Sequence, residues 1–569
     1  MSPFVRAQNV LSGDRTLAWS VFCLLLAAYL ATFAGLPENP DAEVEFQTTS
    51  ALVRNQSFAL GGTSEAEFLK SIEHQGRQGY NLRAGKPGRE DELFSWSGIG
   101  QPLVAFPFYI AGSFLARLFP EVEAAHRETT HMGAGLSEYF EHLLVGLRNP
   151  LLGALTGALI VLAARRAGAR RLHAGLAGVS YGLCTYAWPQ ARGTLSDVQA
   201  SAALFLAFTA TQSVAERLER GKPGKLGSVL GFGAALGMAF LTRPVMAPAV
   251  AVLALFHVVV CVRAARELAP GRVPWRELVL GFAPAAALFA LALYTNWSRF
   301  GAPLEFGYGG VVTSSWFLKP SGVGLAGVGF SPGSGLVWYA PALLLVVPWL
   351  VHELRRGERR LPCLVLAMLA AIGIPHVLIP SWHGAWSYGP RYVLPMLPFL
   401  WFPLGVAFGL LWERLLGRVL VLFLLGLGGV SALGGVLVEY TTNIDLSVQA
   451  ARLEWPELPG LTSELDIGEE RFVRTKFDWR FAAPWAHWRI LRHRVAGLGE
   501  SFPVRELYYL ERDERIEPTF ERWRGFGHLA WVDLARRTGG VGWIGPALCA
   551  ALLLASGALL LRAREADTV

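Results

Sequence analysis

Twelve apolar segments run through this chain of 569 residues, and the loops that join them alternate between arginine-rich and arginine-poor. Each segment approaches the roughly 20 residues with which a helix crosses the hydrocarbon layer of a membrane. Because 53% of the residues are hydrophobic and 17% are charged, the chain is more apolar than the core of a water-soluble protein requires. We therefore expect an all-α polytopic membrane protein with about 12 transmembrane helices. The predicted spans are residues 17–36, 143–164, 172–188, 198–214, 226–241, 245–262, 278–297, 336–351, 361–379, 393–412, 419–438 and 541–561.

The arginine-rich loops determine the expected orientation, because Lys and Arg are retained on the cytoplasmic side of a membrane. Arg6 and Arg15 precede the first span, so the N-terminus is predicted to be cytoplasmic, and an even number of spans returns the C-terminal tail to the same side. The net charge of +7 then reflects loop topology, and no nucleic-acid partner is expected. We predict an integral protein of the plasma (inner) membrane, in contact with membrane lipids. Its basic inner loops are expected near residues 165–171, 217–225, 263–276, 355–360 and 414–418.

Residues 101–119 are apolar enough to resemble a further span. If they crossed the membrane, every later basic loop would move to the outer side, so we expect a helix that lies along, or dips into, the outer interface. The expected organisation has three parts. They are a transmembrane domain at 1–438 with an outer juxtamembrane loop at 37–142, an extracytoplasmic region of unknown function at 439–540, and a last helix with a cytoplasmic tail at 541–569.

Carboxylates follow two of the spans on the predicted outer side. Asp41 and Glu43 come just after the first span, close to the bilayer yet wet enough to stay ionised, which suits a general base. The alternative is an acidic residue at a helix N-terminus that only caps free backbone amides. Asp197 opens a later apolar helix, where it could be a helix cap or the polar wall of a phosphate pocket.

Single arginines stand in the otherwise arginine-poor outer loops, at Arg192, Arg243 and Arg391. Such side chains could hold a phosphate bidentately, or they could pair with a carboxylate or extend to the membrane surface. The loop 381–392 adds His383 and Tyr388. His383 could donate to a phosphate or carry a proton, but it could equally be structural, and Tyr388 could belong to an interfacial aromatic belt.

The order of these elements resembles the GT-C superfamily of membrane glycosyltransferases, especially the branch of protein O-mannosyltransferases and the lipid A aminoarabinose transferase. The resemblance rests on the acidic motif of Asp41 and Glu43, on GIGQPLVAFPFY at 98–109, on the segment 192–197, and on GPRYVLPMLPFL at 389–400. It covers roughly residues 17–412, and residues 439–540 match no part of that superfamily.

The resemblance implies an inverting transfer of a sugar from a polyprenyl-phosphate carrier to a lipid, glycan or protein acceptor on the extracytoplasmic face. Asp41 would be the base, with Glu43 as the alternate, because the Asp-Ala-Glu order departs from the adjacent acidic residues frequent in the superfamily. Asp197 would orient the donor or a metal. The residues implied in binding the donor or its phosphate are Arg192, Asp197, Arg243, His383, Tyr388 and Arg391.

Metal use and two other functions remain open. Some members of the superfamily use a divalent cation, Mg²⁺ or Mn²⁺, but this chain has no dense carboxylate cluster of the kind a hard cation prefers, so we expect catalysis without a tightly held metal. A lipid or glycan transporter or flippase would also be polytopic, but it should carry ionisable residues along the middle of its spans. A non-catalytic membrane scaffold would keep the fold without the chemistry.

Overall fold

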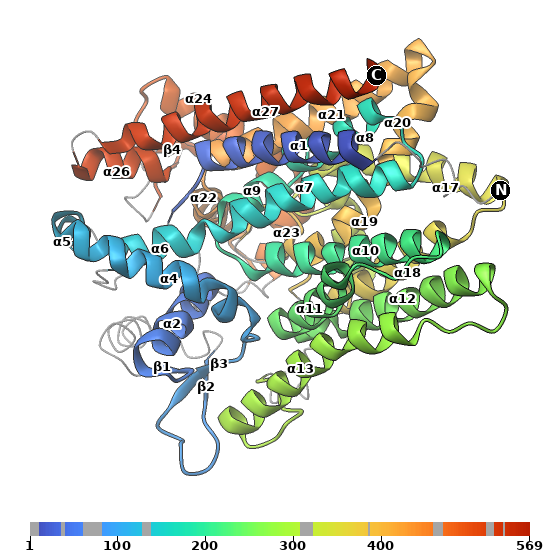
Figure 1. The fold of residues 1–569 in the computed structure, drawn as a ribbon. Coiled ribbons are helices and arrows are strands. Elements are labelled where there is room, and N and C mark those ends of the chain that lie inside the picture. Colours follow the sequence, from blue (N-terminus) through green and yellow to red (C-terminus); the bar gives the residue numbers. More distant parts are fainter. Residues whose placement is uncertain are drawn as a thin grey trace.

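The computed structural model describes residues 11–35, 40–60, 82–127, 138–307, 322–379, 381–384, 387–458, 470–518, 528–538 and 541–568. Most of these residues are helical, which confirms the predicted mostly helical class. The helices pack side by side around α10 (Ser196–Glu219), which contacts α7 (Arg148–Arg166), α11 (Leu226–Thr242) and α12 (Ala247–Leu268) (Figure 1). Phe205 and Phe208 of α10 meet Phe399 and Phe402 in the shared apolar core.

Eight helices of the described chain are long and apolar enough to cross a membrane. They are Gly13–Ala31, Tyr139–Arg166, Ser196–Glu219, Pro244–Leu268, Trp275–Phe300, Arg360–Val377, Leu415–Leu437 and Ile544–Ala563. A pair bent by 52°, Arg391–Trp401 with Leu404–Trp412, brings the number to nine if it is one span. The multi-span expectation is therefore confirmed at this level, whereas the described helices do not reach the predicted number of about 12.

Three predicted spans differ because their helices are short or interrupted. Residues 172–188 divide into α8 (Arg171–Leu183) and α9 (Ala187–Arg192), and α11 has 17 residues. Residues 336–351 divide into α16 (Leu336–Tyr339), the 3₁₀ helix η3 (Pro341–Leu345) and α17 (Val346–Arg355). Proline lacks a backbone N–H and collides with the preceding turn, so prolines such as Pro341 end one helix and begin the next. The pair of helices bent by 52° comprises η4 (Arg391–Met396), α19 (Leu397–Trp401) and α20 (Leu404–Trp412). A proline, Pro403, also stands at this break.

The arginine-rich loops gather toward one end of the bundle, on the right of Figure 1. Near the start of α1 (Leu11–Ala31), Asp14 accepts hydrogen bonds from Arg165 and Arg171, with N–O distances of 3.0 and 2.9 Å. Other ion pairs between distant basic loops are Arg170–Glu413 and Arg360–Glu267. Their common end agrees with the loop assignment made from the sequence, and the cytoplasmic orientation of that end remains a prediction.

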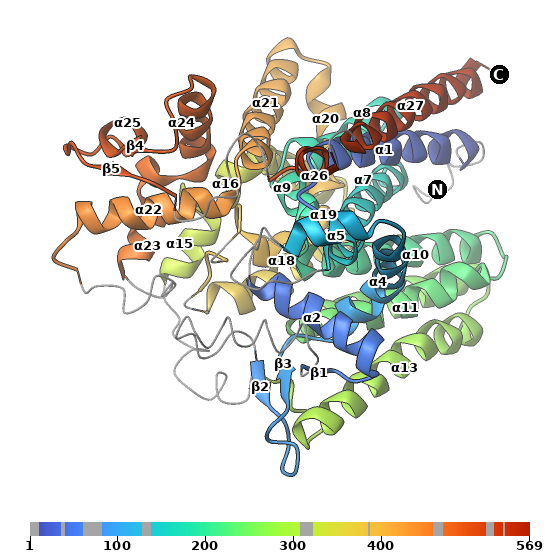
Figure 2. The same ribbon diagram turned by 90° about the vertical axis from the view of Figure 1, so that its left-hand side faces the viewer.

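The last span packs along the first. α27 (Ile544–Thr568) lies beside α1, where the hydroxyl of Ser556 donates to the carbonyl oxygen of Ser20 at 3.0 Å (Figure 2). The remaining long helices are α13 (Trp275–Phe300), α18 (Arg360–Val377) and α21 (Leu415–Leu437), and α12 is preceded by η2 (Pro244–Met246).

Short elements between α1 and α7 gather at the opposite end of the bundle. They are α2 (Pro40–Asn55), α4 (Gly100–Leu118), α5 (Pro120–Arg127), α6 (Tyr139–Gly146) and an antiparallel sheet of β1 (Ala59–Leu60), β3 (Leu93–Ser95) and β2 (Leu82–Ala84). α4 coincides with the segment predicted to lie at the interface and is not among the candidate spans; its depth in the membrane remains a prediction. A Cβ at Gly98 would lie 2.2 Å from the carbonyl oxygen of Leu241, so glycine permits the close contact before α4.

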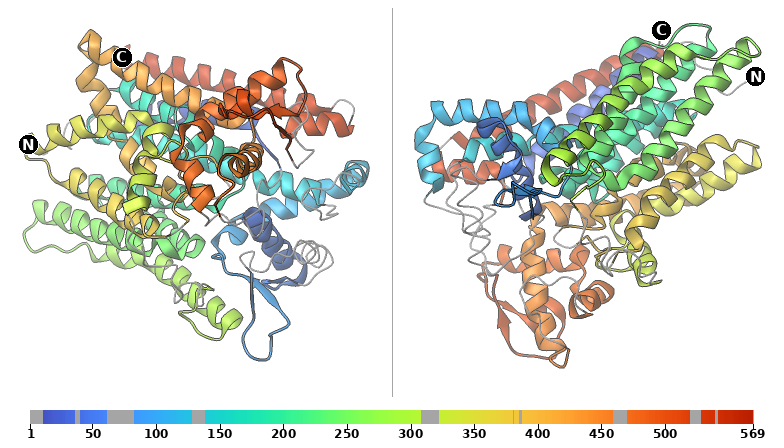
Figure 3. Two further views of the ribbon diagram at one scale, coloured as in Figure 1. Left: turned by 180° about the vertical axis from the view of Figure 1, so that it is seen from behind. Right: turned by 90° about the horizontal axis from the view of Figure 1, so that it is seen from below.

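The described residues from α22 (Tyr440–Glu454) to β5 (Arg515–Ile516) build a smaller helical region with a core of its own, around Leu446, Ile490, Phe502 and Tyr508. Figure 2 and Figure 3 show this region at the same end of the bundle as α2. Its elements are α22 (Tyr440–Glu454), α23 (Glu470–Phe477), η5 (Trp479–Phe481), α24 (Ala483–Val495), β4 (Phe502–Pro503), α25 (Val504–Tyr508) and β5 (Arg515–Ile516). The other short helices are α15 (Gly322–Phe330), α26 (Ala530–Thr538) and η7 (Val541–Trp543).

Candidate functional site

The helix α2 begins at Pro40 and carries acidic residues in its first turn, where its N-terminal dipole favours negative charge. Residues four positions apart share one face of a helix, whereas residues two positions apart do not. Asp41 and Glu45 therefore share a face, and Glu43 lies on another. This difference separates the two acids that the sequence motif had grouped.

Asp41 is paired with an arginine from the far half of the chain. Nη2 of Arg391 donates to a carboxylate oxygen of Asp41 at 2.8 Å. The Arg391 side chain is only 5% exposed, whereas that of Asp41 is 37% exposed. Arg391 opens η4 directly after a tight turn in which Gly389 has a φ of 73°, and a Cβ there would press against Tyr339 and Tyr186. The turn thus needs glycine, and it directs Arg391 toward α2.

A second acid–base pair stands beside the first. Asp197, in the first turn of α10, is bonded to Arg243, which lies in the break between α11 and η2. The ring of Tyr392 connects the two pairs, with the guanidinium carbon of Arg391 at 4.9 Å and that of Arg243 at 5.5 Å from the ring centre. The structure therefore brings Asp41, Asp197, Arg243 and Arg391 together, and their role in one substrate site on the outer side stays a prediction.

Glu45 is an acid of this site that the sequence reasoning missed. It is 5% exposed, and burial raises the pKa of its carboxyl to about 8, against the opposing effect of Arg148. One of its carboxylate oxygens has no hydrogen-bond partner within the described residues. The spacing of four residues from Asp41 was the available signal, because it places both acids on one face of α2.

Arg148, also unassigned by the sequence reasoning, stands at the start of α7. Its Nη2 donates to the backbone carbonyl of Thr194 at 2.7 Å, just before Asp197 in the chain. The neighbouring Asn149 donates to the carbonyl of Leu195 at 2.8 Å. These bonds fix the segment that leads into α10, and so they position Asp197.

Glu43 points away from the site toward α6. One of its oxygens accepts from Gln47 at 2.6 Å, and the other lies 3.0 Å from Nε2 of His142. Phe46 stacks on the His142 ring with the ring centres 3.5 Å apart. The structure thus places Glu43 in a buried anchor between α2 and α6, where it does not share the position of Asp41 as an alternate base would.

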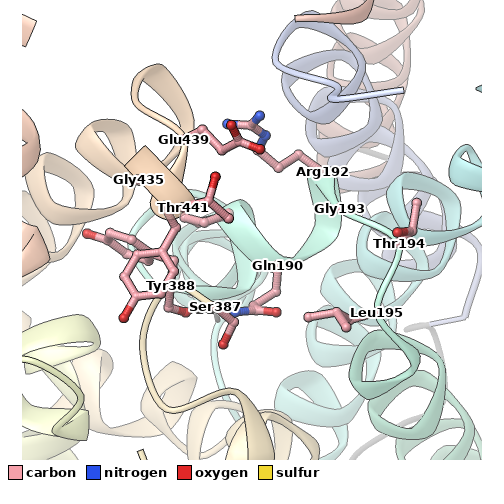
Figure 4. A pocket seen from close by; sticks show the side chains of 12 residues that line it. Gln190, Arg192, Gly193, Thr194, Leu195, Ser387, Tyr388, Gly435, Glu439 and Thr441 are labelled. Atoms are coloured by element: carbon pink, nitrogen blue, oxygen red, sulfur yellow. Dashed lines mark hydrogen bonds between the residues drawn. The ribbon is translucent and has the colours of Figure 1, made fainter. Parts of the chain in front are cut away.

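Arg192 and Tyr388 line a narrow cleft next to the paired charges, with about 30 Å³ of space open to a water-sized molecule (Figure 4). Nη1 of Arg192 donates to the carbonyl of Val436 at 2.8 Å, and the hydroxyl of Tyr388 donates to the carbonyl of Ser431. The cleft is lined by Pro189, Gln190, Arg192, Gly193, Thr194, Leu195, Ser387, Tyr388, Gly435, Glu439, Tyr440 and Thr441. Since Asp197 and Arg391 follow two of these segments within a few residues, the cleft adjoins the charged site.

His383 lies on the side of this loop that meets the C-terminal region. Its side chain is buried, and its ring centre is 5.1 Å from that of Phe472 on α23. Its carbonyl accepts a hydrogen bond from Ser334 at 3.3 Å. Residues 385–386 of the same loop, including Trp386, lie outside the described residues. His383 therefore connects this loop to α23 and to the segment before α16.

The donor set does not suit a divalent cation. Asp41 and Asp197 each already hold a guanidinium group, so a cation bound there would have to displace an arginine or lie beside one. Within the described ranges, no group of three or more His, Cys, Asp and Glu side chains is arranged to hold a metal. The expectation of metal-independent chemistry thus stays a prediction, and no step below requires a metal.

Comparisons with known proteins give limited similarity. No family model matches the chain, and no curated protein matches it. Among solved structures, ArnT from Cupriavidus metallidurans in the apo state has 15% identity and a TM-score of 0.39, with 95% of this chain and 75% of that chain covered. The same ArnT bound to undecaprenyl phosphate has 15% identity and a TM-score of 0.40, with 98% and 78% covered. Neither value establishes a common family.

Proposed function

We propose that this protein is a membrane glycosyltransferase of the GT-C type, which transfers a sugar from a polyprenyl-phosphate carrier to a lipid, glycan or protein acceptor on the extracytoplasmic face, with inversion. The observation that carries the proposal is the pairing of a partly exposed carboxylate, Asp41, with buried Arg391, beside the second pair of Asp197 and Arg243. A base and phosphate-binding cations are the two parts that this reaction requires at one place.

In an inverting displacement, the acceptor attacks the sugar carbon on the face opposite the departing phosphate. Asp41 would take the proton from the acceptor hydroxyl or amine as the new bond forms, because it is the site's most exposed carboxylate. The bond between the sugar and the phosphate oxygen breaks at the same time, and the electron pair leaves with the lipid phosphate. Negative charge therefore develops at the phosphate, where guanidinium groups stabilise it.

Arg391 is suited to that second role while it holds Asp41. Only one of its nitrogens contacts Asp41, and Nε has no hydrogen-bond partner within the described residues. A phosphate could bind this side of the guanidinium without breaking the ion pair. Arg243 and Arg192 would complete the phosphate site from the α11–α12 connection and from the cleft.

The test is sugar transfer from radiolabelled polyprenyl-phosphate sugars by the full chain in proteoliposomes. The wild type is compared with Asp41→Asn and Arg391→Ala, and with Glu43→Gln as the matched acidic control on the other face of α2. We expect product from the wild type and from Glu43→Gln but none from the first two variants. Donor binding without transfer in the wild type would favour a transporter, flippase or scaffold, and equal transfer by Asp41→Asn would exclude Asp41 as the base.

A further inference from the structure

The C-terminal region holds a buried lysine with no carboxylate partner among the described residues. Lys476, on α23, is 5% exposed. Its Nζ donates to the hydroxyl of Tyr440 at 2.9 Å, and it lies 4.4 Å from the ring centre of Phe472. Lysine is seldom buried unless it is paired, because removing an ammonium group from water is costly. The position of Lys476 therefore calls for a compensating anion.

Lys476 is connected to the wall of the cleft through its hydrogen bond to Tyr440. Tyr440, its hydrogen-bond partner, is one of the residues that line the cleft together with Arg192 and Tyr388. The ring centres of Tyr440 and Tyr388 are 6.1 Å apart. The backbone carbonyl of Lys476 accepts from the amide of Gly333 at 2.9 Å, so the start of the α16 segment holds this part of α23 in place.

The side chains recorded in contact with the Lys476 ammonium group are those of Tyr440 on α22 and of Phe472 on α23, and neither carries a negative charge. The segment before α16 supplies the backbone of Gly333 and no ionisable side chain at this contact. Burial lowers the pKa of Lys476 to about 7, so its charge is easily lost near neutral pH unless an anion is present.

We propose that the hydroxyl of Tyr440 binds the phosphate of the lipid-linked substrate in the cleft, and that Lys476 is a positioning residue that holds and polarises this hydroxyl from behind. The Tyr440 oxygen accepts from Lys476 and keeps its own proton to donate to a phosphate oxygen. The phosphate would supply the missing negative charge and favour the ammonium form of Lys476. Tyr440 of α22 and Lys476 of α23 would thus complete a donor site that is otherwise built by the transmembrane helices. This inference rests on the proposed function and names a further part of its substrate site.

The first experiment measures binding of undecaprenyl phosphate and of uncharged undecaprenol to the full chain in nanodiscs. We expect Tyr440→Phe and Lys476→Met each to weaken binding of the phosphate by about tenfold, as the loss of a charge-assisted hydrogen bond does. Binding of undecaprenol should stay unchanged. Lys476→Arg should retain most of the affinity, and Arg474→Gln, on the same helix but paired outward with Glu470, should match the wild type.

The second experiment measures the pH dependence of the same binding. Because Lys476 loses its proton as pH rises through about 7, the affinity of the wild type for undecaprenyl phosphate should fall between pH 6 and 8.5 relative to Lys476→Arg. The phosphate's own titration is common to both proteins and cancels in this ratio. If Lys476→Met does not fold, Tyr440→Phe and this ratio decide the question.

Equal binding of the phosphate by the wild type, Tyr440→Phe and Lys476→Met would overturn the inference, as would a ratio that does not change with pH. If sugar transfer depends on Asp41 while those variants bind normally, only this inference fails. If the wild type neither transfers sugar nor binds the lipid phosphate, the proposed function fails and this inference falls with it.

Discussion

The two faces of α2 both carry acidic side chains, but these side chains have different roles. On one face, both carboxylate oxygens of Glu43 have partners, Gln47 and His142, and the side chain is buried. On the other face, Asp41 is 37% exposed and Glu45 keeps an oxygen without a hydrogen-bond partner in the described structure. A carboxylate whose oxygens are all engaged serves to hold a helix, whereas one that still meets solvent can exchange a proton with a substrate.

The face of α2 that carries Glu43, Ser50 and Arg54, here called the anchoring face, holds the helix in place, and the face with Asp41 and Glu45 is thereby kept at a fixed position. Besides Glu43, buried Glu138 accepts hydrogen bonds from Ser50 at 3.1 Å and Tyr109 at 2.6 Å, and it pairs with Arg54 at 2.7 Å. These contacts tie α2 to α4 and to the start of α6. The comparison predicts that changes on the anchoring face reduce stability, and that changes on the other face reduce chemistry.

The largest expected effect is that of Asp41→Asn on transfer. Removing a general base lowers a rate by roughly 10²–10⁴-fold, so we expect a fall in kcat of about 10³-fold, or about 4 kcal/mol. Transfer kinetics in proteoliposomes provide the measurement. Glu43→Gln is the control and should keep kcat within about twofold. If Asp41→Asn and Glu43→Gln lower kcat by the same factor and neither changes the thermal unfolding curve, the two faces of α2 do not differ in function.

The next effect is expected on the anchoring face. His142→Ala leaves Glu43 buried without its charged partner and removes the ring that stacks on Phe46. Breaking a buried ion pair in this way costs about 3 kcal/mol of stability. Thermal denaturation in detergent should show a lower midpoint, while kcat per folded molecule should stay near that of the wild type. A normal midpoint with lost activity would instead place Glu43 and His142 in the chemistry.

We expect the ionisation of Glu45 to make the free energy of unfolding depend on pH. Its pKa is about 8 in the folded protein and 4.5 ordinarily, so the stabilising protonated form is lost as pH rises through about 8. Between pH 6 and 8, the free energy of unfolding should fall by roughly 2 kcal/mol in the wild type through this group. Glu45→Gln, which imitates the protonated acid, should remove that fall. Parallel curves for both proteins would show that Glu45 does not titrate in this range.

Much of the candidate site could be predicted because charged residues are conspicuous at the ends of apolar segments. Asp41, Asp197, Arg243 and Arg391 stand out against arginine-poor loops, and the structure brings these four together. What the sequence could not supply was the direction of each side chain. In the sequence, Asp41 and Glu43 look like neighbouring acids of one site. On the helix they point in different directions, and Glu43 contacts α6.

The same limit explains the other differences. Glu45 and Arg148 lie in helices, and neither belongs to a sequence motif that indicates a functional site. Only their positions in the folded structure associate them with the candidate site. The predicted number of about 12 spans stays a prediction, because hydropathy does not show where proline interrupts a helix, as Pro341 does between α16 and η3. Residues 439–540, which matched nothing from the sequence, turn out to line the cleft through Glu439, Tyr440 and Thr441.

The smallest expected effect is that of metal removal. In Asp41 and Asp197, the carboxylates that could receive a cation already bind arginines, and Glu43 is engaged by Gln47 and His142. Arginine then provides the positive charge that a metal would bring to the departing phosphate. EDTA treatment of proteoliposomes should therefore leave the transfer rate within about twofold, and added Mg²⁺ or Mn²⁺ should not raise it. A loss of transfer that either ion restores would mean that a cation enters beside the arginines, and the two faces of α2 would then differ in metal binding as well as in exposure.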